Sequence, residues 1–277
     1  MFVLNVECGP GMVHYVDMDA PLEPRAGTQV VARVGAVLRA VSAHAPAPIS
    51  TSDVAAATRL TRPTAHRLLS ALATEGFLDR DGAGWVTGPE LYLMGSIAAE
   101  RYDIAELARE HVRELARLTG ESAFLSARRG DETVCLLREE GSFPIRSFVL
   151  HEGIRFPLGV ASAGLAILAF LPQEERDEYL DRARLEGEWG VSHATAHLLE
   201  RLERTRATGY SVNPGLLVEG SWGMGAAVFD ERGRPAWALS LTGIESRFRD
   251  DRRRELGRAL LQHAHALSQQ LSRAPGR

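Results

Sequence analysis

The stretch from Ile49 to Phe77 constrains the fold of this chain most strongly, because it predicts two short helices joined by a tight turn. The first helix has good N-caps in Ser50 and Ser52, and it buries Val54 and Ala55. Two helices with such a short connection are typical of helix-turn-helix proteins that bind DNA. An ordinary amphipathic helical hairpin is the alternative interpretation.

The second helix of this pair separates an apolar face from a polar face. It opens at Thr61 with Pro63 in its first turn, where the missing amide hydrogen has no intrahelical partner, and it ends at Gly76. Apolar residues at i, i+3, i+4 and i+7 share the buried face: Ala65, Leu68, Leu69 and Leu72. Arginine can fork onto guanine, and hydroxyl groups can bind phosphates. The residues of this helix that we expect to contact DNA are Arg62, Pro63, Thr64, His66, Arg67 and Ser70.

A small hairpin is predicted directly after the helix pair. Apolar residues at 77–78 and 85–86 flank Asp81-Gly82, a common turn sequence. Arg80 would lie on this hairpin, where we expect it to contact backbone phosphates beside the recognition helix. The hairpin therefore completes the pattern of a winged helix-turn-helix.

A further helix is predicted ahead of the pair, since apolar residues keep helical spacing from Val30 to Ala43. Together these elements predict a winged helix-turn-helix DNA-binding domain over residues 28–88. This segment carries six arginines against four acidic residues, a net charge of +2, whereas the whole chain has a formal net charge of −4. Because phosphate neutralisation dominates nucleic-acid affinity, the charge distribution favours a DNA surface in this part of the chain.

The rest of the chain predicts a linker helix and a second domain. Residues 1–27 show no clear periodicity and are expected to be a loose extension. Residues 89–101 form the expected linker helix, whose apolar stripe suits linking or dimerisation. Residues 102–272 mix helices and strands, which predicts an α+β domain with an antiparallel or mixed sheet, followed by a tail at 273–277.

Within the second domain, turn sequences and apolar patterns place the individual elements. The expected helices include residues 103–119, 192–207 and 250–271. The expected strands are a hairpin around Gly130-Asp131, a third strand from Pro144 to Leu150, and a pair at 225–229 and 236–241.

The chain resembles the IclR family of bacterial transcriptional regulators over about residues 28–272. The resemblance rests on stretches that occur in the family's order: LTRPTAHRLLSALATEGFL, RFPLGVASAGLAILAFLP, GYSVNPG and GMGAAVFDERGRPAWALSLTG. It implies a winged-helix domain, a linker helix and a GAF-like C-terminal domain that binds a small organic acid effector. It also implies double-stranded operator DNA as a partner and assembly into homodimers or homotetramers.

The resemblance also implies where the effector binds. Ser162, Ala163 and Gly164 match the helix start at which family members present backbone amides to an effector carboxylate. A helix N-terminus offers free N–H groups and a partial positive charge, so it can hold an anion without an arginine. Four further positions are expected to line this pocket: Asn213, Met224, Ser240 and Thr242.

Several residues depart from the family pattern near this pocket. Leu165 stands where a lysine is usual, and Gly159 replaces a frequent histidine or similar residue. The segment 213–215 replaces a more acidic one, while Trp222 and Met224 add apolar bulk. Fewer acids and more apolar surface favour an aromatic or otherwise bulky carboxylate over a two- or three-carbon acid.

Metal and cofactor chemistry finds little support in the sequence. His193 and His197 are four residues apart on an expected helix, but no third ligand accompanies them, so a solvated helix face is the expected arrangement. Cys8 and Cys135 are too few and too far apart for a zinc site or a disulfide framework. We expect no metal and no cofactor.

Two alternatives to a DNA-binding regulator remain at this stage. One is an enzyme of unknown reaction fused to a DNA-binding module, although Ser162 and Ser221 lack the Gly-x-Ser-x-Gly sequence of a hydrolase elbow. The other is a winged helix that binds protein instead of DNA. The apolar run from Gly159 to Leu171 is too short to span a bilayer, and no secretory signal is apparent, so a cytoplasmic protein without a membrane partner is expected.

Overall fold

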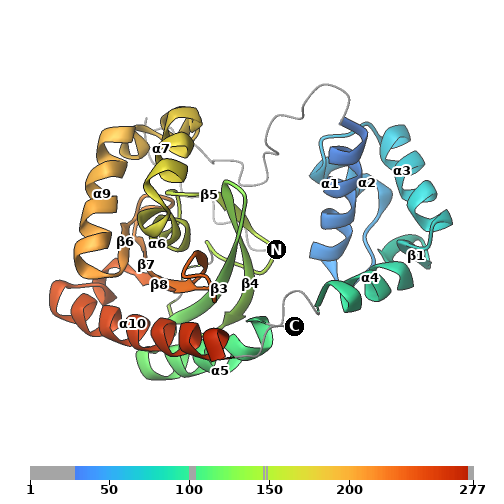
Figure 1. The fold of residues 1–277 in the computed structure, drawn as a ribbon. Coiled ribbons are helices and arrows are strands. Elements are labelled where there is room, and N and C mark those ends of the chain that lie inside the picture. The colour runs from blue at the N-terminus through green and yellow to red at the C-terminus, as the bar shows by residue number, and fades with distance from the viewer. Residues whose placement is uncertain (1–28, 100–103, 146, 148, 274–277) are drawn as a thin grey trace. The chain divides into compact units, whose positions relative to one another are not determined.

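The computed structural model describes residues 29–99, 104–145, 147 and 149–273. The chain divides into two compact units, residues 1–102 and residues 103–277 (Figure 1). The expected extension over residues 1–27 lies outside the described residues, as do residues 274–277 of the expected tail.

The N-terminal unit consists of helices and a two-stranded wing. Its elements in chain order are α1 (Gln29–His44), α2 (Thr51–Ala57), α3 (Arg62–Thr74), β1 (Leu78–Asp81), β2 (Gly84–Thr87) and α4 (Pro89–Ala99). β1 and β2 pair antiparallel, and Ile49 adds an isolated bridge to Trp85. The predicted winged helix-turn-helix architecture is confirmed, and α4 occupies the described part of the expected linker helix.

Local capping explains why the helix pair begins and ends where the sequence predicts. Ser50 is the N-cap of α2, and its hydroxyl accepts a hydrogen bond from the backbone N–H of Asp53 at 3.1 Å. Thr61 is the N-cap of α3, with Pro63 in the first turn. Gly76 follows α3 with φ of +77°, a conformation that glycine adopts without strain.

A small apolar core holds this unit together. The buried face of α3 contributes Ala65, Leu69 and Leu72, whereas Leu68 is only half-buried. These side chains belong to one cluster with buried residues of α1, α2 and the wing: Val37, Val41, Ile49, Val54, Ala55, Leu78 and Trp85. Packing of the apolar face therefore fixes which side of α3 remains available to a partner.

The C-terminal unit is built on a six-stranded antiparallel sheet in the order β5-β4-β3-β8-β7-β6. Its strands are β3 (Ser122–Arg129), β4 (Glu132–Glu139), β5 (Arg155–Pro157), β6 (Ser211–Pro214), β7 (Ser221–Phe229) and β8 (Pro235–Ile244). Its helices are α5 (Ile104–Thr119), α6 (Ser162–Phe170), α7 (Gln173–Arg182), α8 (Leu185–Trp189), α9 (Thr195–Thr208) and α10 (Asp250–Arg273), with short 3-10 turns at Val191–His193 and Glu245–Arg247. The predicted α+β class is confirmed.

Helices cover both faces of this sheet (Figure 1). α5 and α10 pack on one face, where Met224, Leu239 and Leu241 are buried with them. α6 packs on the other face, and α9 packs against α6. Because side chains alternate along a strand, neighbouring residues of β7 and β8 belong to different cores.

The strand predicted from Pro144 to Leu150 is wrong for the described residues, which form bends and irregular chain there. The edge strand next to β4 is β5, which begins only at Arg155. Val149 and Leu150 are nevertheless buried. Their apolar character therefore reflects packing of a connecting segment over the unit, not alternation in a sheet.

The predicted helix over residues 192–207 is interrupted. His193 ends a 3-10 turn, and α9 begins only at Thr195, after Ala194 has adopted extended φ and ψ of −56° and 146°. His193 is also 1% exposed, so the expected solvated face carrying both histidines is wrong for this residue. His197 is exposed on α9.

Candidate DNA-contacting surface and ligand pocket

The polar face of α3 carries most of the candidate DNA contacts. Six of the predicted residues lie on this helix, and four of them are exposed: Arg62, Pro63, His66 and Arg67. Thr64 and Ser70 are half-buried, and the Thr64 hydroxyl oxygen lies 2.9 Å from that of Thr61. The face thus presents cations and ring atoms at the N-terminal half of the helix, which is the half that reaches base edges in helix-turn-helix proteins.

Trp85 of the wing connects this face to the rest of the domain. Its side chain is buried, and Nε1 donates a hydrogen bond to the Thr51 hydroxyl at 2.9 Å. The His66 ring packs edge-on against the indole, with 6.4 Å between ring centroids. Sequence reasoning assigned Trp85 only to the hairpin and missed that it holds a predicted DNA-contact residue.

Arg80 also packs on this indole. Its guanidinium carbon lies 3.8 Å from the Trp85 ring centroid, and its Nη1 donates a hydrogen bond to the carbonyl of Ala83 at 3.2 Å. The side chain is exposed, yet these two interactions hold it at the tip of the wing. A wing arginine held in this way loses less conformational freedom when it meets a phosphate.

The start of α6 forms the centre of the second candidate site. Ala161 is the N-cap, and the first intrahelical bond runs from the N–H of Leu165 to the carbonyl of Ala161 at 2.9 Å. The N–H groups of Ser162, Ala163 and Gly164 therefore precede the helical hydrogen-bond ladder. All three residues are buried, so an anion at this position would meet donors and the helix dipole out of bulk water.

Three hydroxyl groups lie on the sheet face that packs against α6. Thr242 lines a cavity beside Ser162, Ser122 pairs directly with Thr242 across the strands, and Ser240 lies two residues along β8. All three hydroxyl oxygens are buried and have no hydrogen-bond partner among the described residues. Buried hydroxyls cost free energy until they are hydrogen-bonded, so this surface is suited to a polar ligand. Ser240 and Thr242 were predicted, whereas Ser122 was missed.

Asn213 borders the same cavity but uses its polar atoms elsewhere. Its Nδ2 donates to the carbonyl of Val160 at 2.7 Å, and its Oδ1 accepts from the N–H of Leu216 at 3.0 Å. It therefore ties the end of β6 to the segment that leads into α6. The geometry favours a role in positioning the helix start over direct ligand contact.

The expectation that Met224 lines the pocket is wrong. Met224 is fully buried on the opposite face of the sheet, in the core beneath α5 and α10. Gly223 and Gly225 face α6 instead, and a Cβ at Gly225 would lie 2.9 Å from the Ser162 carbonyl oxygen. Trp222 is among the residues that line the cavity, while its ring lies 5.2 Å from the guanidinium carbon of Arg253 on α10.

The cavity itself is small, with a volume of about 20 Å³. This is close to the space that one water molecule needs. Its apolar lining includes Val149, Leu150 and Leu217, which belong to connecting segments. Sequence reasoning missed these residues because connecting segments carry no periodic pattern. A ligand larger than water requires these segments to move.

The described residues contain no group of three histidine, cysteine, aspartate or glutamate side chains arranged to hold a metal ion. Burial, followed by the charge of Glu152, raises the pKa of the Cys135 thiol to about 12, so this cysteine stays protonated at neutral pH. Within the same residues, no helix combines the length and the apolar character needed to cross a membrane.

A winged helix-turn-helix followed by an α+β domain with a buried pocket defines a transcriptional regulator. The chain belongs to the IclR family: residues 30–82 match the IclR helix-turn-helix domain, and residues 97–269 match the bacterial transcriptional regulator IclR C-terminal domain. It is therefore a DNA-binding transcriptional regulator and not an enzyme.

Individual relatives agree with this assignment. The chain is 30% identical to the HTH-type transcriptional regulator KipR of Bacillus subtilis over 211 residues, which cover 76% of this chain and 84% of KipR. The crystal structure of Thermotoga maritima IclR is 26% identical, with a TM-score of 0.69 and coverage of 88% of this chain and 99% of that one. An IclR homologue from Microbacterium hydrocarbonoxydans, crystallised with 4-hydroxybenzoate, shares the fold at 23% identity and a TM-score of 0.68, covering 87% of this chain and 98% of the homologue.

Proposed function

We propose that this regulator binds double-stranded operator DNA through the exposed face of α3, and that a small organic acid at the N-terminus of α6 controls its occupancy. One observation carries the proposal. The free N–H groups at the start of α6 and the three unpartnered hydroxyls of the adjoining sheet face lie in the same buried region. An effector can act only if it binds two states of the protein unequally. We propose a change in the spacing or mobility of the DNA-binding domains as that difference.

The division of labour in the proposal follows the expected domains. Residues 28–88 would bind DNA, residues 89–101 would link, and residues 102–272 would bind the effector in the cytoplasm. The contacts of α3 would include a guanine contact from Arg67, with His66 and Arg62 beside it on the exposed face. Arg80 would contact a phosphate from the wing.

The DNA proposal is tested by gel shift on genomic fragments that the wild-type protein has selected. Arg67→Ala should weaken specific binding by about 1–3 kcal/mol. Arg33→Ala is the matched control, because it removes the same charge from an exposed position on α1. If Arg67→Ala binds as tightly as the wild type, the winged helix contacts protein or uses another surface. Binding that does not weaken as salt rises would also contradict phosphate contacts.

The effector proposal is tested by thermal shift with carboxylates of different size. The apolar lining by Val149, Leu150 and Leu217 supports an aromatic or bulky acid, and 4-hydroxybenzoate is a suitable probe because a relative of the same fold was crystallised with it. A ligand at one hundred times its Kd stabilises by about 2.7 kcal/mol. Stabilisation by glyoxylate or pyruvate alone would refute the bulky class.

The hydroxyls should report on the same site. Ser240→Ala and Thr242→Val each remove a buried hydroxyl that has no partner among the described residues, so the free protein should keep or gain stability. The thermal shift with the effector should shrink in both variants. An unchanged shift would place the effector away from this sheet face.

Assembly into a homodimer or homotetramer completes the proposal. α4 packs near β1 and leaves four large apolar side chains more than half exposed: Tyr92, Leu93, Met94 and Ile97. Native mass spectrometry should find dimers or tetramers, and Ile97→Glu should shift them toward smaller species. A wild-type monomer at micromolar concentration would contradict this part.

A further inference from the structure

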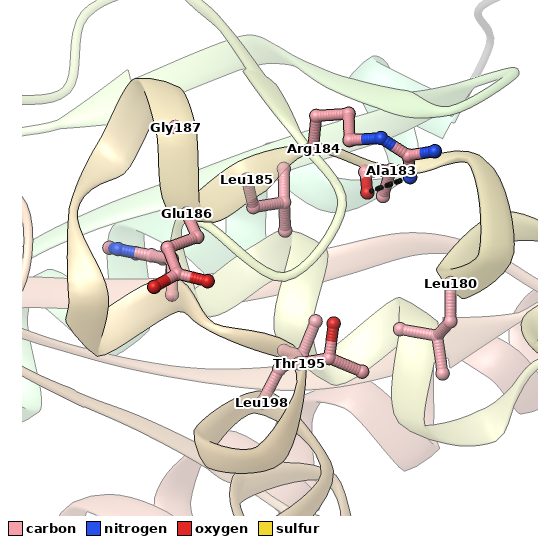
Figure 2. A pocket seen from close by; sticks show the side chains of 9 residues that line it. Leu180, Ala183, Arg184, Leu185, Glu186, Gly187, Thr195 and Leu198 are labelled. Carbon is pink, nitrogen blue, oxygen red and sulfur yellow. Dashed lines mark hydrogen bonds between the residues drawn. The ribbon is translucent and has the colours of Figure 1, made fainter.

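A cleft separate from the α6 pocket lies among α7, α8 and the start of α9 (Figure 2). Its volume is about 440 Å³, within the range of small-molecule sites. Leu180, Leu185 and Leu198 supply apolar surface from three different elements, and Figure 2 shows them around the hollow. The exposed side chains of Arg184 and Glu186 also border it. A small ligand with an apolar body fits this lining.

His193 is the buried polar side chain of this lining, at 1% exposure. Its Nδ1 lies 2.9 Å from the carbonyl oxygen of Trp189. A carbonyl only accepts, so Nδ1 carries the proton and donates it. The Nε2 atom is buried and has no hydrogen-bond partner among the described residues. In a neutral ring with this tautomer, Nε2 is an acceptor without a donor.

The surroundings keep this ring neutral. Burial lowers the pKa of His193, and the positive charge of Arg201 lowers it further. Arg201 is itself 6% exposed and forms no salt bridge with a described residue; it donates to the carbonyls of Ser192 and His197. The hydrogen bond to Trp189 and the nearby Val160 carbonyl oppose the shift only in part. The Val160 carbonyl already accepts from Asn213 and, as an acceptor, it cannot satisfy an unprotonated nitrogen.

We propose that this cleft is a second small-molecule site, which takes a compact apolar molecule whose hydroxyl or amine group displaces the side chains that cover His193 and donates a hydrogen bond to its buried Nε2. The ligand differs in chemistry from the organic acid proposed at α6, because the unprotonated Nε2 of His193 accepts a hydrogen bond and so requires a donor. The leucines would enclose its apolar part.

The cleft also adjoins the segment that leads into α6. A Cβ at Gly159 would lie 2.9 Å from Cδ1 of Leu198, so this cleft-lining leucine packs directly against the chain three residues before Ser162. A ligand that moves Leu198 would therefore also shift the backbone at Gly159, which leads into the α6 pocket. Any coupling between the two sites must be reciprocal in binding free energy.

The test uses the full-length protein and three probes of nearly equal size: benzyl alcohol, benzyl methyl ether and toluene. Only the alcohol can donate a hydrogen bond. It should bind about tenfold more tightly than the ether, the effect of one satisfied buried acceptor. In protein with ¹⁵N-labelled histidine, the Nε2 signal that disappears in His193→Phe should move when the alcohol binds and stay in place with the ether.

Three variants keep the test decisive. Gly187→Trp fills the cleft from a position where a Cβ meets no atom within 4 Å, so it should fold normally and bind none of the three probes. His193→Phe should bind the alcohol and the ether equally, while His197→Phe changes an exposed histidine outside the lining and should behave as the wild type. Equal binding of alcohol and ether by the wild type, or unchanged binding by Gly187→Trp, would overturn the proposal and leave the effector proposal untouched.

Discussion

Arg80 stacks on Trp85 with 3.8 Å between its guanidinium carbon and the ring centroid, and the same indole supports the edge of His66. One buried aromatic side chain therefore positions two of the predicted DNA contacts, one on the wing and one on α3. The recognition surface is supported as a unit, because the wing and the helix share this ring.

Replacing Arg80 separates its stacking role from a phosphate contact. Arg80→Ala should weaken binding to all DNA sequences to a similar degree and reduce the slope of log K against log salt by about 1. The measurement is fluorescence anisotropy at several salt concentrations with specific and unrelated DNA. A loss of affinity without a change in slope would mean that Arg80 only supports the wing.

Replacing Asn213 by aspartate should destabilise the protein. In Asn213→Asp, a carboxylate oxygen would face the Val160 carbonyl that now accepts from Nδ2. A buried acceptor that loses its donor costs about 1–3 kcal/mol. Urea denaturation should show this loss at pH 7 and partial recovery at low pH, where a protonated carboxyl can donate. Equal stability of the two proteins would show that the segment before α6 rearranges freely.

Glu121 should be the most costly carboxylate to remove in the C-terminal unit. It is 2% exposed, and its carboxylate accepts hydrogen bonds from Nε of Arg247 at 2.7 Å and from Nη2 of Arg252 at 3.3 Å. Removing one partner of a buried pair costs about 3–5 kcal/mol, and the partly exposed arginines favour the lower end.

The matched control for Glu121→Ala is Glu114→Ala, which removes a glutamate from the exposed pair with Arg117 on α5. Exposed ion pairs are screened by water and contribute little to stability, so Glu114→Ala should lose much less stability than Glu121→Ala. Chemical denaturation of both variants measures the difference. Similar losses for the two variants would contradict the assigned role of the buried network.

Stability should fall as the solution becomes mildly acidic. Burial lowers the pKa of His193 and, with the charge of His111, that of His263. Both groups therefore bind protons more readily in the unfolded chain, whose histidine pKa is 6.5. Their neutral forms contribute fully above pH 6.5, and the contribution is lost as pH falls from there toward the lower folded values. Urea midpoints between pH 7.5 and 5 measure this loss, and a rising midpoint in the acid would contradict it.

The N-terminal domain was predictable almost residue by residue, because its limits depend on local chemistry. A serine N-cap, a first-turn proline and a glycine after α3 act within a few residues of the boundary they set. The buried face of α3 follows from helical spacing alone. The tertiary contacts of this domain were not predictable, because nothing near Trp85 in the sequence indicates that it contacts His66 and Arg80.

The C-terminal pocket was less predictable, because its lining depends on strand register and on where helices are interrupted. The start of α6 was expected at Ser162 and is found there. Met224, however, points to the opposite face of the sheet, because side chains alternate along β7 and its neighbours Gly223 and Gly225 are the residues that face α6. His193 and His197 are separated by an extended residue, Ala194, without a proline or glycine to indicate it. The lining by Val149, Leu150 and Leu217 comes from segments whose course depends on the whole unit.

Helix α6 has almost no outer surface, since every residue from Ser162 to Ala169 is buried between the sheet and α9. Random mutation of this helix would therefore mostly yield unfolded protein instead of altered ligand preference. The connecting segments around Val149 and Leu217 also line the cavity, and connecting segments in general accept substitutions more readily than a buried helix. A library for a redesigned biosensor should diversify those segments and leave α6 unchanged.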